Sequence, residues 1–262
     1  MTALIHLTVP VTPSPPAVLP DFVTDVRPPD HGSPLRAAAQ AARVAELAGL
    51  HGVSVPFRPD GLDSLVTAAA LLRGTSGVQV SAEFHPAIAT PVYAAKLSAS
   101  LQRFHANRLA WLLTVDLDPG LARAQGDFLA GQDRYARASE FLTVAKGVWN
   151  DGGSFSCEGR FFEVLEGGLP SSRSAPRFPK VYLRGTSPEA LALSAEHADV
   201  HLLQPGEDPA LVPPHVARGI ELTDITLAGQ YLEAGVTEFF LQVTDPVAAM
   251  LRVPGLELAS AH

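Results

Sequence analysis

The sequence contains a single cysteine, Cys157, in 262 residues. One cysteine excludes an internal disulfide framework and any metal or iron–sulfur site built from several cysteines. Lysine is nearly as scarce, since Lys96, Lys146 and Lys180 are the three lysines of the chain, and 27 acidic residues exceed 19 lysines and arginines. A protein that binds nucleic acid needs a basic face, and a net charge of −8 without a basic cluster argues against such a partner.

Long hydrophobic runs are also missing. No apolar stretch approaches the roughly 18–20 residues that a helix needs to cross a bilayer. The first residues, MTALIHLTVPVTPSPP, carry no basic leader, and His6 and Pro10 interrupt their apolar run, so we expect no secretory signal. Hydrophobic residues still make up 47% of the chain, enough for a large core. These features predict a cytoplasmic protein with no membrane partner.

Short apolar segments alternate with helical segments along the chain. The pattern predicts strands at 3–9, 52–56, 78–83, 109–115, 181–185, 200–203 and 238–243. It predicts helices at 35–48, 62–73, 91–104, 133–149, 187–195 and 227–234, and a β-hairpin at about 154–165. Connections of this length suit parallel crossovers, so we expect an α/β barrel. Seven strands are one fewer than a complete (β/α)8 barrel contains.

The strongest local signal for a ligand is VYLRGTSPEA at 181–190. An apolar strand runs into Gly185, Thr186 and Ser187, and Pro188 then begins a helix. Backbone N–H groups at a helix N-terminus, two hydroxyls and a glycine that permits close approach suit a phosphate group. In a barrel this turn lies at the C-terminal rim, where phosphates are often bound. An ordinary serine N-cap without a ligand is the alternative.

The histidines give weaker signals. His85 follows the strand at 78–83, so in a barrel it would lie at the same rim and could serve as a hydrogen-bond donor or an acid/base. A loop histidine beside Pro86 without such a role is the alternative. His197 and His201 are four residues apart, but the predicted helix ends before His201, so their spacing does not indicate a metal site. Cys157 has no neighbouring base and is assigned a structural role.

Two long segments resemble one family. They are DRYARASEFLTVAKGVWNDGGSFSCEGRFFEV (133–164) and KVYLRGTSPEALALSAEHADVHLLQPGEDP (180–209). Both resemble the reduced-FMN-dependent alkanesulfonate monooxygenases of the bacterial-luciferase-like superfamily, and GQYLEAGVTEFFL (229–241) is similar to the final helix and strand of that family. The resemblance implies a single luciferase-like TIM-type barrel domain over residues 1–262, with the hairpin at about 154–165 as an insertion.

The resemblance also implies a cofactor and partners. It places the FMN phosphate at Gly185, Thr186 and Ser187, and adds flavin contacts from Tyr135 and Thr114. Reduced FMN would come from a separate flavin reductase, and the substrate would be a small organic molecule such as an alkanesulfonate. Superfamily members commonly pair through early helices, so we expect a homodimer formed by the helices at 35–48 and 62–73.

The departures from the family concern catalysis. Only about 20 residues, from Glu207 to Thr226, separate the strand at 200–203 from the final helix. The family has there a longer segment with a strand bearing Arg-x-His, so we expect a barrel that lacks one βα unit near residues 207–226. His85 is then the sole, weak candidate for catalysis. Two functions stay open: a flavin-dependent monooxygenase, or a catalytically silent flavin-binding or scaffold homologue.

Overall fold

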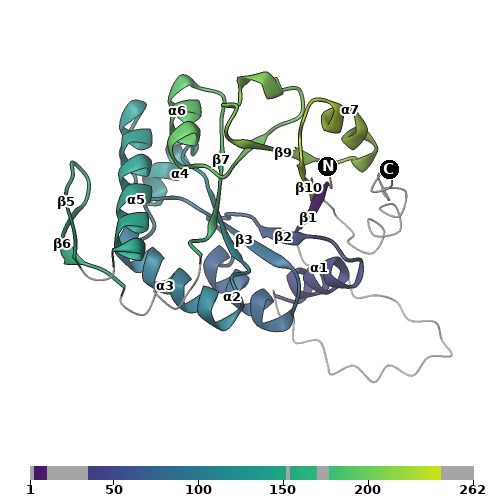
Figure 1. Ribbon diagram of the computed structural model, residues 1–262, viewed down its shortest axis with the longest axis horizontal. Coiled ribbons are helices and arrows are strands. Elements are labelled where there is room, and N and C mark those ends of the chain that lie inside the picture. The colour runs from purple at the N-terminus through teal and green to yellow at the C-terminus, as the bar shows by residue number, and fades with distance from the viewer. Residues whose placement is uncertain (1–2, 11–34, 152–153, 170–176, 243–262) are drawn as a thin grey trace.

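Eight parallel strands form a closed barrel (Figure 1). The computed structural model describes residues 3–10, 35–151, 154–169 and 177–242. Around the barrel the strand order is β1-β10-β9-β8-β7-β4-β3-β2. The strands are β1 (Leu4–Thr8), β2 (Gly52–Val55), β3 (Gln79–Phe84), β4 (Leu109–Leu113), β7 (Lys180–Arg184), β8 (Val200–Leu203), β9 (Ala217–Leu222) and β10 (Glu238–Gln242). The expected α/β barrel is therefore confirmed.

Helices cover the outside of the barrel (Figure 1). They are α1 (Arg36–Leu47), α2 (Ser64–Gly74), α3 (Pro91–Phe104), α4 (Pro119–Ala124), α5 (Gln132–Asn150), α6 (Pro188–His197) and α7 (Ala228–Glu233). Side-chain caps begin several of them: Asp63 accepts from the Val66 N–H, and Thr90 precedes Pro91 at the first position of α3. Within the described ranges, no helix is long and apolar enough to cross a membrane.

A two-stranded antiparallel hairpin, β5 (Phe155–Glu158) and β6 (Glu163–Gly167), lies outside the barrel beside α5 (Figure 1). The Glu140 carboxylate of α5 accepts the backbone N–H groups of Arg160, Phe161 and Phe162, the residues of the hairpin turn. One side chain thus attaches the turn to the helix.

The expectation that the barrel lacks one βα unit near residues 207–226 is wrong, because β9 (217–222) lies inside that stretch and pairs with β8 and β10. The connection before it is short and holds a single 3-10 turn, η2 (Pro209–Leu211), with a second, η3 (Ile225–Leu227), after it. The segment ARGIEL does not look like a buried strand because it carries two charged residues and a glycine. Close packing of β9 on β8 favours Gly219, since a Cβ would lie 3.0 Å from a methyl group of Leu202 and 3.2 Å from one of Val200.

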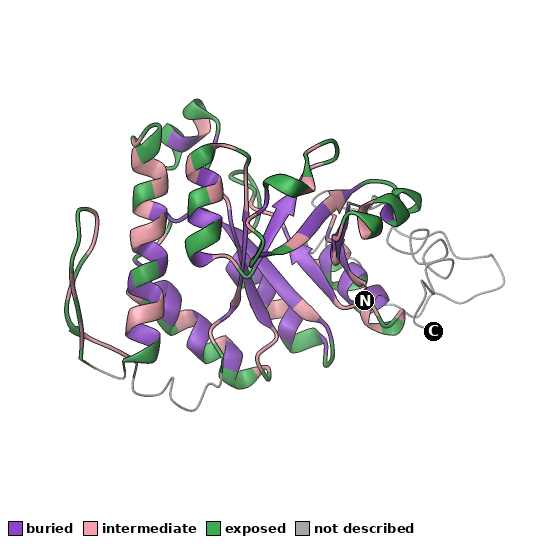
Figure 2. Cartoon of the chain, turned by 45° about the horizontal axis from the view of Figure 1, so that its top comes forward, coloured by how far each residue is buried: buried purple, intermediate pink, exposed green. Residues whose placement is uncertain are grey.

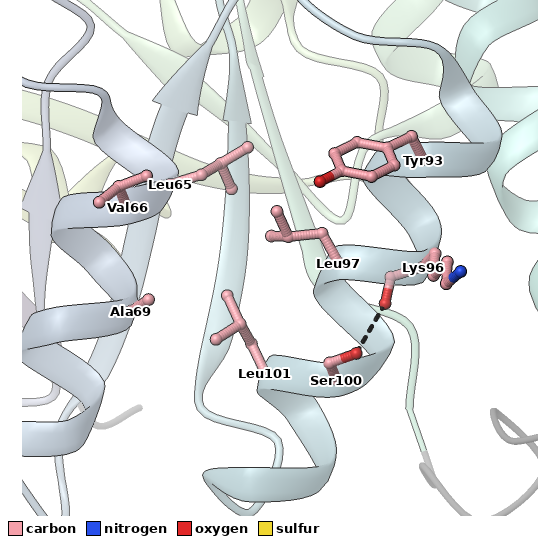
Figure 3. A pocket seen from close by; sticks show the side chains of 8 residues that line it. All are labelled: Leu65, Val66, Ala69, Tyr93, Lys96, Leu97, Ser100 and Leu101. Carbon is pink, nitrogen blue, oxygen red and sulfur yellow. Dashed lines mark hydrogen bonds between the residues drawn. The ribbon is translucent and has the colours of Figure 1, made fainter.

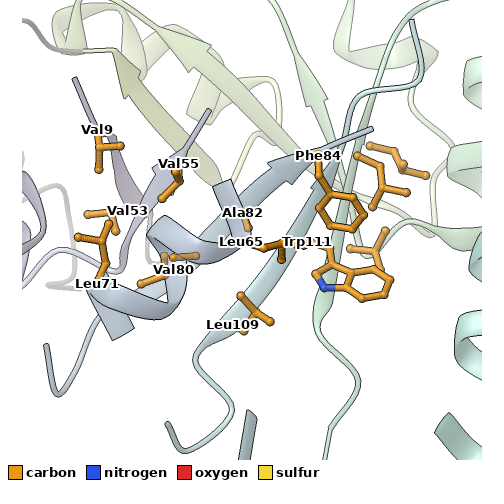
Figure 4. Packing of buried hydrophobic residues seen from close by; sticks show 14 of the residues in the cluster. Val9, Val53, Val55, Leu65, Leu71, Val80, Ala82, Phe84, Leu109 and Trp111 are labelled. Atoms are coloured by element: carbon orange, nitrogen blue, oxygen red, sulfur yellow. The ribbon is translucent and has the colours of Figure 1, made fainter. Parts of the chain in front are cut away.

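The apolar core has two parts. The larger fills the space between the strands and the helices, where Phe84 and Trp111 pack edge to face with ring centroids 5.2 Å apart (Figure 4). The smaller lies inside the barrel and comprises Ala110, Leu112, Tyr182, Val200, Leu202 and Phe240. Figure 2 shows the strands as the buried centre of the molecule, with exposed residues on the outer helix faces. Burial of the strands on both faces explains why they read as continuous apolar runs.

A buried polar network closes the N-terminal end of the barrel. The Glu238 carboxylate is ion-paired with Lys180, accepts a hydrogen bond from the Tyr182 hydroxyl at 2.8 Å and lies 3.3 Å from His6 Nε2. The His6 ring is not aligned for a hydrogen bond, and burial lowers the pKa of His6 below its ordinary value of 6.5. Burial acts to raise the pKa of Glu238, but His6 and Lys180 together lower it to about 2. The group is therefore ionised throughout the neutral range.

Replacing Glu238 with alanine should lower the free energy of unfolding by roughly 3–5 kcal/mol, because one partner of a buried ion pair is removed. Urea denaturation at pH 7 measures this change, with Glu163→Ala on the exposed edge of the hairpin as the control. Because the folded-state pKa of Glu238 is lowered, its contribution should be present above pH 4.5 and disappear as the pH falls toward 2. A Glu238→Ala variant as stable as the control would contradict this assignment.

Candidate functional site

A guanidinium group bridges two carboxylates at the C-terminal mouth of the barrel. Arg184 Nη2 lies 3.2 Å from Glu83 Oε1 and 3.1 Å from Glu221 Oε1. Arg184 ends β7, whereas Glu83 belongs to β3 and Glu221 to β9, and neither of these strands is a neighbour of β7. The contacts therefore span the mouth from the inside. We call Glu83, Arg184 and Glu221 the rim cluster.

Both carboxylates of the rim cluster have further donors. The Thr114 hydroxyl donates to Glu83 Oε1, and the Phe57 N–H donates to Glu83 Oε2 at 3.2 Å. Gln204 Nε2 donates to Glu221 Oε2 at 2.6 Å. Arg184 Nε is buried and has no acceptor within the described part of the chain. The three ionised groups sum to one negative charge, held in a fixed arrangement around the mouth.

The turn after β7 has the backbone geometry that close approach of a ligand requires. Gly185 has a φ of +108°, a region that L side chains rarely adopt. A Cβ there would lie 3.0 Å from Ala190 Cβ and 3.7 Å from the Tyr135 hydroxyl, so a side chain at this position would press against α6 and lie beside α5. Ser187 is the N-cap of α6 and accepts the Ala190 N–H at 3.1 Å. Thr186 is exposed beside it.

The predicted site residues divide into two groups. Tyr135 lies at the turn, with its hydroxyl 3.4 Å from Ser187 Oγ, so Gly185, Ser187 and Tyr135 are brought together. Thr114 instead donates to Glu83 of the rim cluster. Glu83 pairs with Arg184, the residue before Gly185, so Thr114 is connected to the turn indirectly. The sequence analysis missed Glu83 and Glu221. Their positions at the ends of β3 and β9 are the signal that could have indicated them.

Tyr135 donates its hydroxyl hydrogen to Asp116. Burial and this carboxylate raise the pKa of Tyr135 to about 12, so the phenol stays protonated at neutral pH. Among the described residues, no protein acceptor contacts the backbone N–H groups of Thr186, Ser187 or Glu189. These groups and the helix dipole of α6, next to a glycine that has no Cβ, suit a phosphate. The carboxylates of Asp116 and Glu189 oppose it, so binding there depends on the backbone N–H groups.

His85 lies at this end of the barrel but is completely buried. Its Nδ1 accepts the Ala87 N–H at 3.1 Å, while Nε2 lies 3.3 Å from the Val115 carbonyl and 3.4 Å from Asp127 Oδ2. Asp127 also forms a bidentate ion pair with Arg137 of α5, in which Arg137 Nη1 lies 2.9 Å from Oδ1 and Nη2 lies 2.8 Å from Oδ2. With both ring nitrogens engaged and no exposed atom, His85 connects the loops of the rim, and the geometry gives it no route to a ligand.

The remaining histidine pair does not converge. His197 Nε2 lies 3.0 Å from Ser139 Oγ of α5. His201 Nδ1 instead lies 2.8 Å from the buried Ser194 Oγ. Across the described ranges, no group of three or more His, Cys, Asp or Glu side chains is arranged to hold a metal ion. Cys157 lies in β5 as a free thiol.

The buried environment of His85 gives a testable pKa. Burial, together with the charge of Arg137, lowers the pKa of His85 below its ordinary value of 6.5, although Asp127 acts in the opposite direction. We expect its imidazole signals in an NMR titration to change below pH 6.5, with His85→Gln used for assignment. Because the folded pKa is lowered, protonation favours the unfolded chain as the pH falls below 6.5. A midpoint above 6.5 would show that the attraction of Asp127 outweighs burial and Arg137, and would contradict this assignment.

The comparisons with known proteins agree with this architecture. The coenzyme F420-dependent tetrahydromethanopterin reductase from Methanopyrus kandleri has a TM-score of 0.67 at 12% identity, over 97% of both chains. A riboflavin lyase, solved with modified FMN and riboflavin, has a TM-score of 0.66 at 18% identity, over 89% of this chain and 66% of its own. The EDTA monooxygenase from Chelativorans sp. BNC1 has a TM-score of 0.61 at 21% identity, over 80% and 57%.

This chain thus spans less than two thirds of the lyase and of the EDTA monooxygenase, and identities this low establish the fold alone. The comparison with protein families goes further, because it covers more than half of the chain. Residues 21–222 match one family, and they include the turn at Gly185 and six of the eight barrel strands, all except β1 and β10 at the closing seam. The chain belongs to the luciferase-like monooxygenases.

Proposed function

We propose that this protein is a flavin-dependent monooxygenase that uses reduced FMN supplied by a separate flavin reductase. Its substrate is a small organic molecule, for which the resemblance to sulfonate monooxygenases nominates an alkanesulfonate. The observation that carries the proposal is the turn at Gly185, where a positive φ, a capped helix N-terminus and the Tyr135 hydroxyl meet at the C-terminal rim. Active sites of barrel enzymes lie at this rim.

Different residues around the mouth would bind the phosphate and the ring system of the cofactor. The backbone N–H groups of Thr186, Ser187 and Glu189 would hold the phosphate, and Tyr135, kept protonated, would remain a neutral neighbour. Thr114 would lie under the ring system, where its hydroxyl is already oriented by Glu83. Reduced FMN, when bound, supplies the reaction with dioxygen. The protein contributes orientation and the exclusion of water from the mouth.

A silent flavin-binding or scaffold homologue is the second candidate, and β9 is the observation that favours it. This strand reads ARGIEL, so it has Arg218 but no histidine, and the family's Arg-x-His pattern is absent even though the strand is present. FMN titration followed by an assay for sulfite release separates the two, with a flavin reductase and short alkanesulfonates in excess. Flavin binding with no oxygenated product from any tested substrate would select the silent homologue.

We also propose a homodimer. α1 and α2 correspond to the two helices predicted to pair, and a groove of about 370 Å³ lies between α2 and α3 (Figure 3). Val66 and Tyr93 line this groove and are 68% and 60% exposed. Apolar side chains this exposed at a groove suit contact with a second copy.

Substitutions at the turn test the cofactor site. Gly185→Val should weaken FMN binding at least about tenfold, because its side chain would press against Ala190 and strain a backbone with positive φ. Ser187→Ala should also weaken binding, since it removes both the cap of α6 and one hydroxyl. Arg184→Ala should have a smaller effect than Gly185→Val, because its guanidinium is held by the two glutamates. Flavin fluorescence titration measures all three.

Circular dichroism of each variant is the control for folding. A folded Gly185→Val protein that binds FMN as tightly as the parent would remove the phosphate site from this turn. An equal loss in Arg184→Ala and Gly185→Val would mean that the guanidinium, and not the backbone, provides the contact.

Sedimentation velocity tests the dimer. We expect a dimer at micromolar concentration for the parent, and a monomer for Val66→Lys, which puts a charge into the proposed interface. Leu165→Lys is the matched control, since Leu165 is 81% exposed on the hairpin and far from α2 in the fold. A parent that sediments as a monomer throughout this range would overturn the proposal.

A further inference from the structure

Thr114 continues β4 into the mouth of the barrel. Its N–H donates to the Phe84 carbonyl at 3.1 Å, so the ladder between β3 and β4 extends one residue past the end of β4. Ala110 and Leu112 face the inside of the barrel, and side chains alternate along a strand, so the Thr114 side chain faces inward as well. Thr114 is only partly buried, so a ligand over the mouth can reach its hydroxyl.

The same hydroxyl lies near the turn that would hold the phosphate. β4 and β7 are neighbouring strands, and Leu112 lies beside Tyr182 in their register. Two residues further along each strand, Thr114 comes beside Arg184, the residue that precedes Gly185. The ribityl chain of FMN separates its phosphate from its ring system. A phosphate at Gly185 therefore leaves the ring within reach of the end of β4.

The single hydrogen of the Thr114 hydroxyl is already in use. It is donated to Glu83 Oε1, the oxygen that also lies 3.2 Å from Arg184 Nη2. The other oxygen, Oε2, accepts the Phe57 N–H at 3.2 Å, so three donors hold this carboxylate in place. A carboxylate paired with a guanidinium has no hydrogen to give in return. Toward any further partner, the Thr114 oxygen can therefore only accept.

This restriction matters because the two states of a flavin differ at one ring nitrogen. In reduced FMN the nitrogen N5 carries a hydrogen and donates, whereas in oxidised FMN the same atom has no hydrogen and accepts. A reduced 5-deazaflavin has carbon at this position and no N–H. Hydrogen bonds to the ring nitrogens are one way in which a protein tunes a flavin. An oxygen that can only accept gains such a bond from reduced FMN alone.

We propose that Thr114 accepts the N5–H of reduced FMN, and that Glu83 is the positioning residue that keeps the Thr114 oxygen an acceptor. The pair thereby selects reduced FMN over oxidised FMN, and FMN over a 5-deazaflavin. The inference rests on the proposed function, because it concerns the same cofactor at the same mouth.

Anaerobic calorimetric titration of the full chain with reduced FMN and reduced 5-deaza-FMN tests the contact. The parent should bind reduced FMN about fivefold more tightly, which is the increment expected of one hydrogen bond. Thr114→Val keeps the shape without the oxygen and should bind the two equally well, whereas Thr114→Ser should retain the preference. Thr143→Val, on the exposed face of α5, is the matched control and should leave the preference at the level of the parent.

Two variants of Glu83 separate its acceptor from its charge. Glu83→Gln and Glu83→Ala both remove the negative charge, but only glutamine retains an oxygen for the donors of Thr114 and Arg184. In Glu83→Ala the hydroxyl can turn and donate to oxidised FMN. The preference for reduced over oxidised FMN should therefore be about fivefold higher in Glu83→Gln than in Glu83→Ala.

Equal binding of reduced FMN and reduced 5-deaza-FMN by the parent would overturn the proposal, and this comparison depends on no variant. A preference that persists in folded Thr114→Val would also overturn it, as would equal preferences in the two Glu83 variants. A parent that binds FMN in neither state contradicts the proposed function, and the Thr114 assignment falls with it. A parent that binds reduced FMN and its 5-deaza analogue alike rejects this inference and leaves the proposed function standing.

Discussion

The double ion pair of Arg184 is the interaction on which the mouth of this barrel depends. It joins β7 to β3 and to β9, strands that the sheet itself does not place side by side. Because it crosses the opening, it fixes the distance between opposite walls and occupies the only guanidinium that the described strand ends direct inward. Because two carboxylates meet one guanidinium, the cluster keeps one net negative charge. Whatever lies over the mouth has to be bound by backbone N–H groups, by the Thr114 oxygen or by apolar surface.

The two ends of the barrel use buried charge differently. At the N-terminal end, Glu238 pairs with Lys180 and accepts from Tyr182, while the ring nitrogens of the neighbouring His6 are buried without a hydrogen bond. At the C-terminal end, Gly185 and the first turn of α6 retain N–H groups without a protein acceptor in the described chain. A satisfied network stabilises the fold, whereas unsatisfied donors at a helix N-terminus are available to a ligand. This division is typical of barrels, which separate stability from function between their two faces.

Much of this fold could be predicted from the sequence, because most strands are apolar on both faces and most helices begin with a clear cap. The helix at 91–104 has such a cap, Thr90 followed by Pro91, and its predicted bounds agree with the structure to the residue. β9 could not be predicted, since its place in the barrel comes from neighbours that pack against Gly219 and not from its own hydrophobicity. The turn at Gly185 was visible as a local motif, but the rim cluster was not. Glu83 and Glu221 are far apart in sequence, and only barrel closure brings both to Arg184.

Closure of the barrel also has a consequence for folding kinetics. β1 and β10, from opposite ends of the described chain, pair in register from Leu4 and Glu238 onward. Contacts between such distant segments carry a large loop-closure entropy, so this seam forms slowly compared with neighbouring βα units. Until β10 is synthesised, β1 and β9 each present an unpaired edge of the kind that promotes association with other chains. The nascent protein thus passes through an open-sheet stage during which chaperone protection matters most.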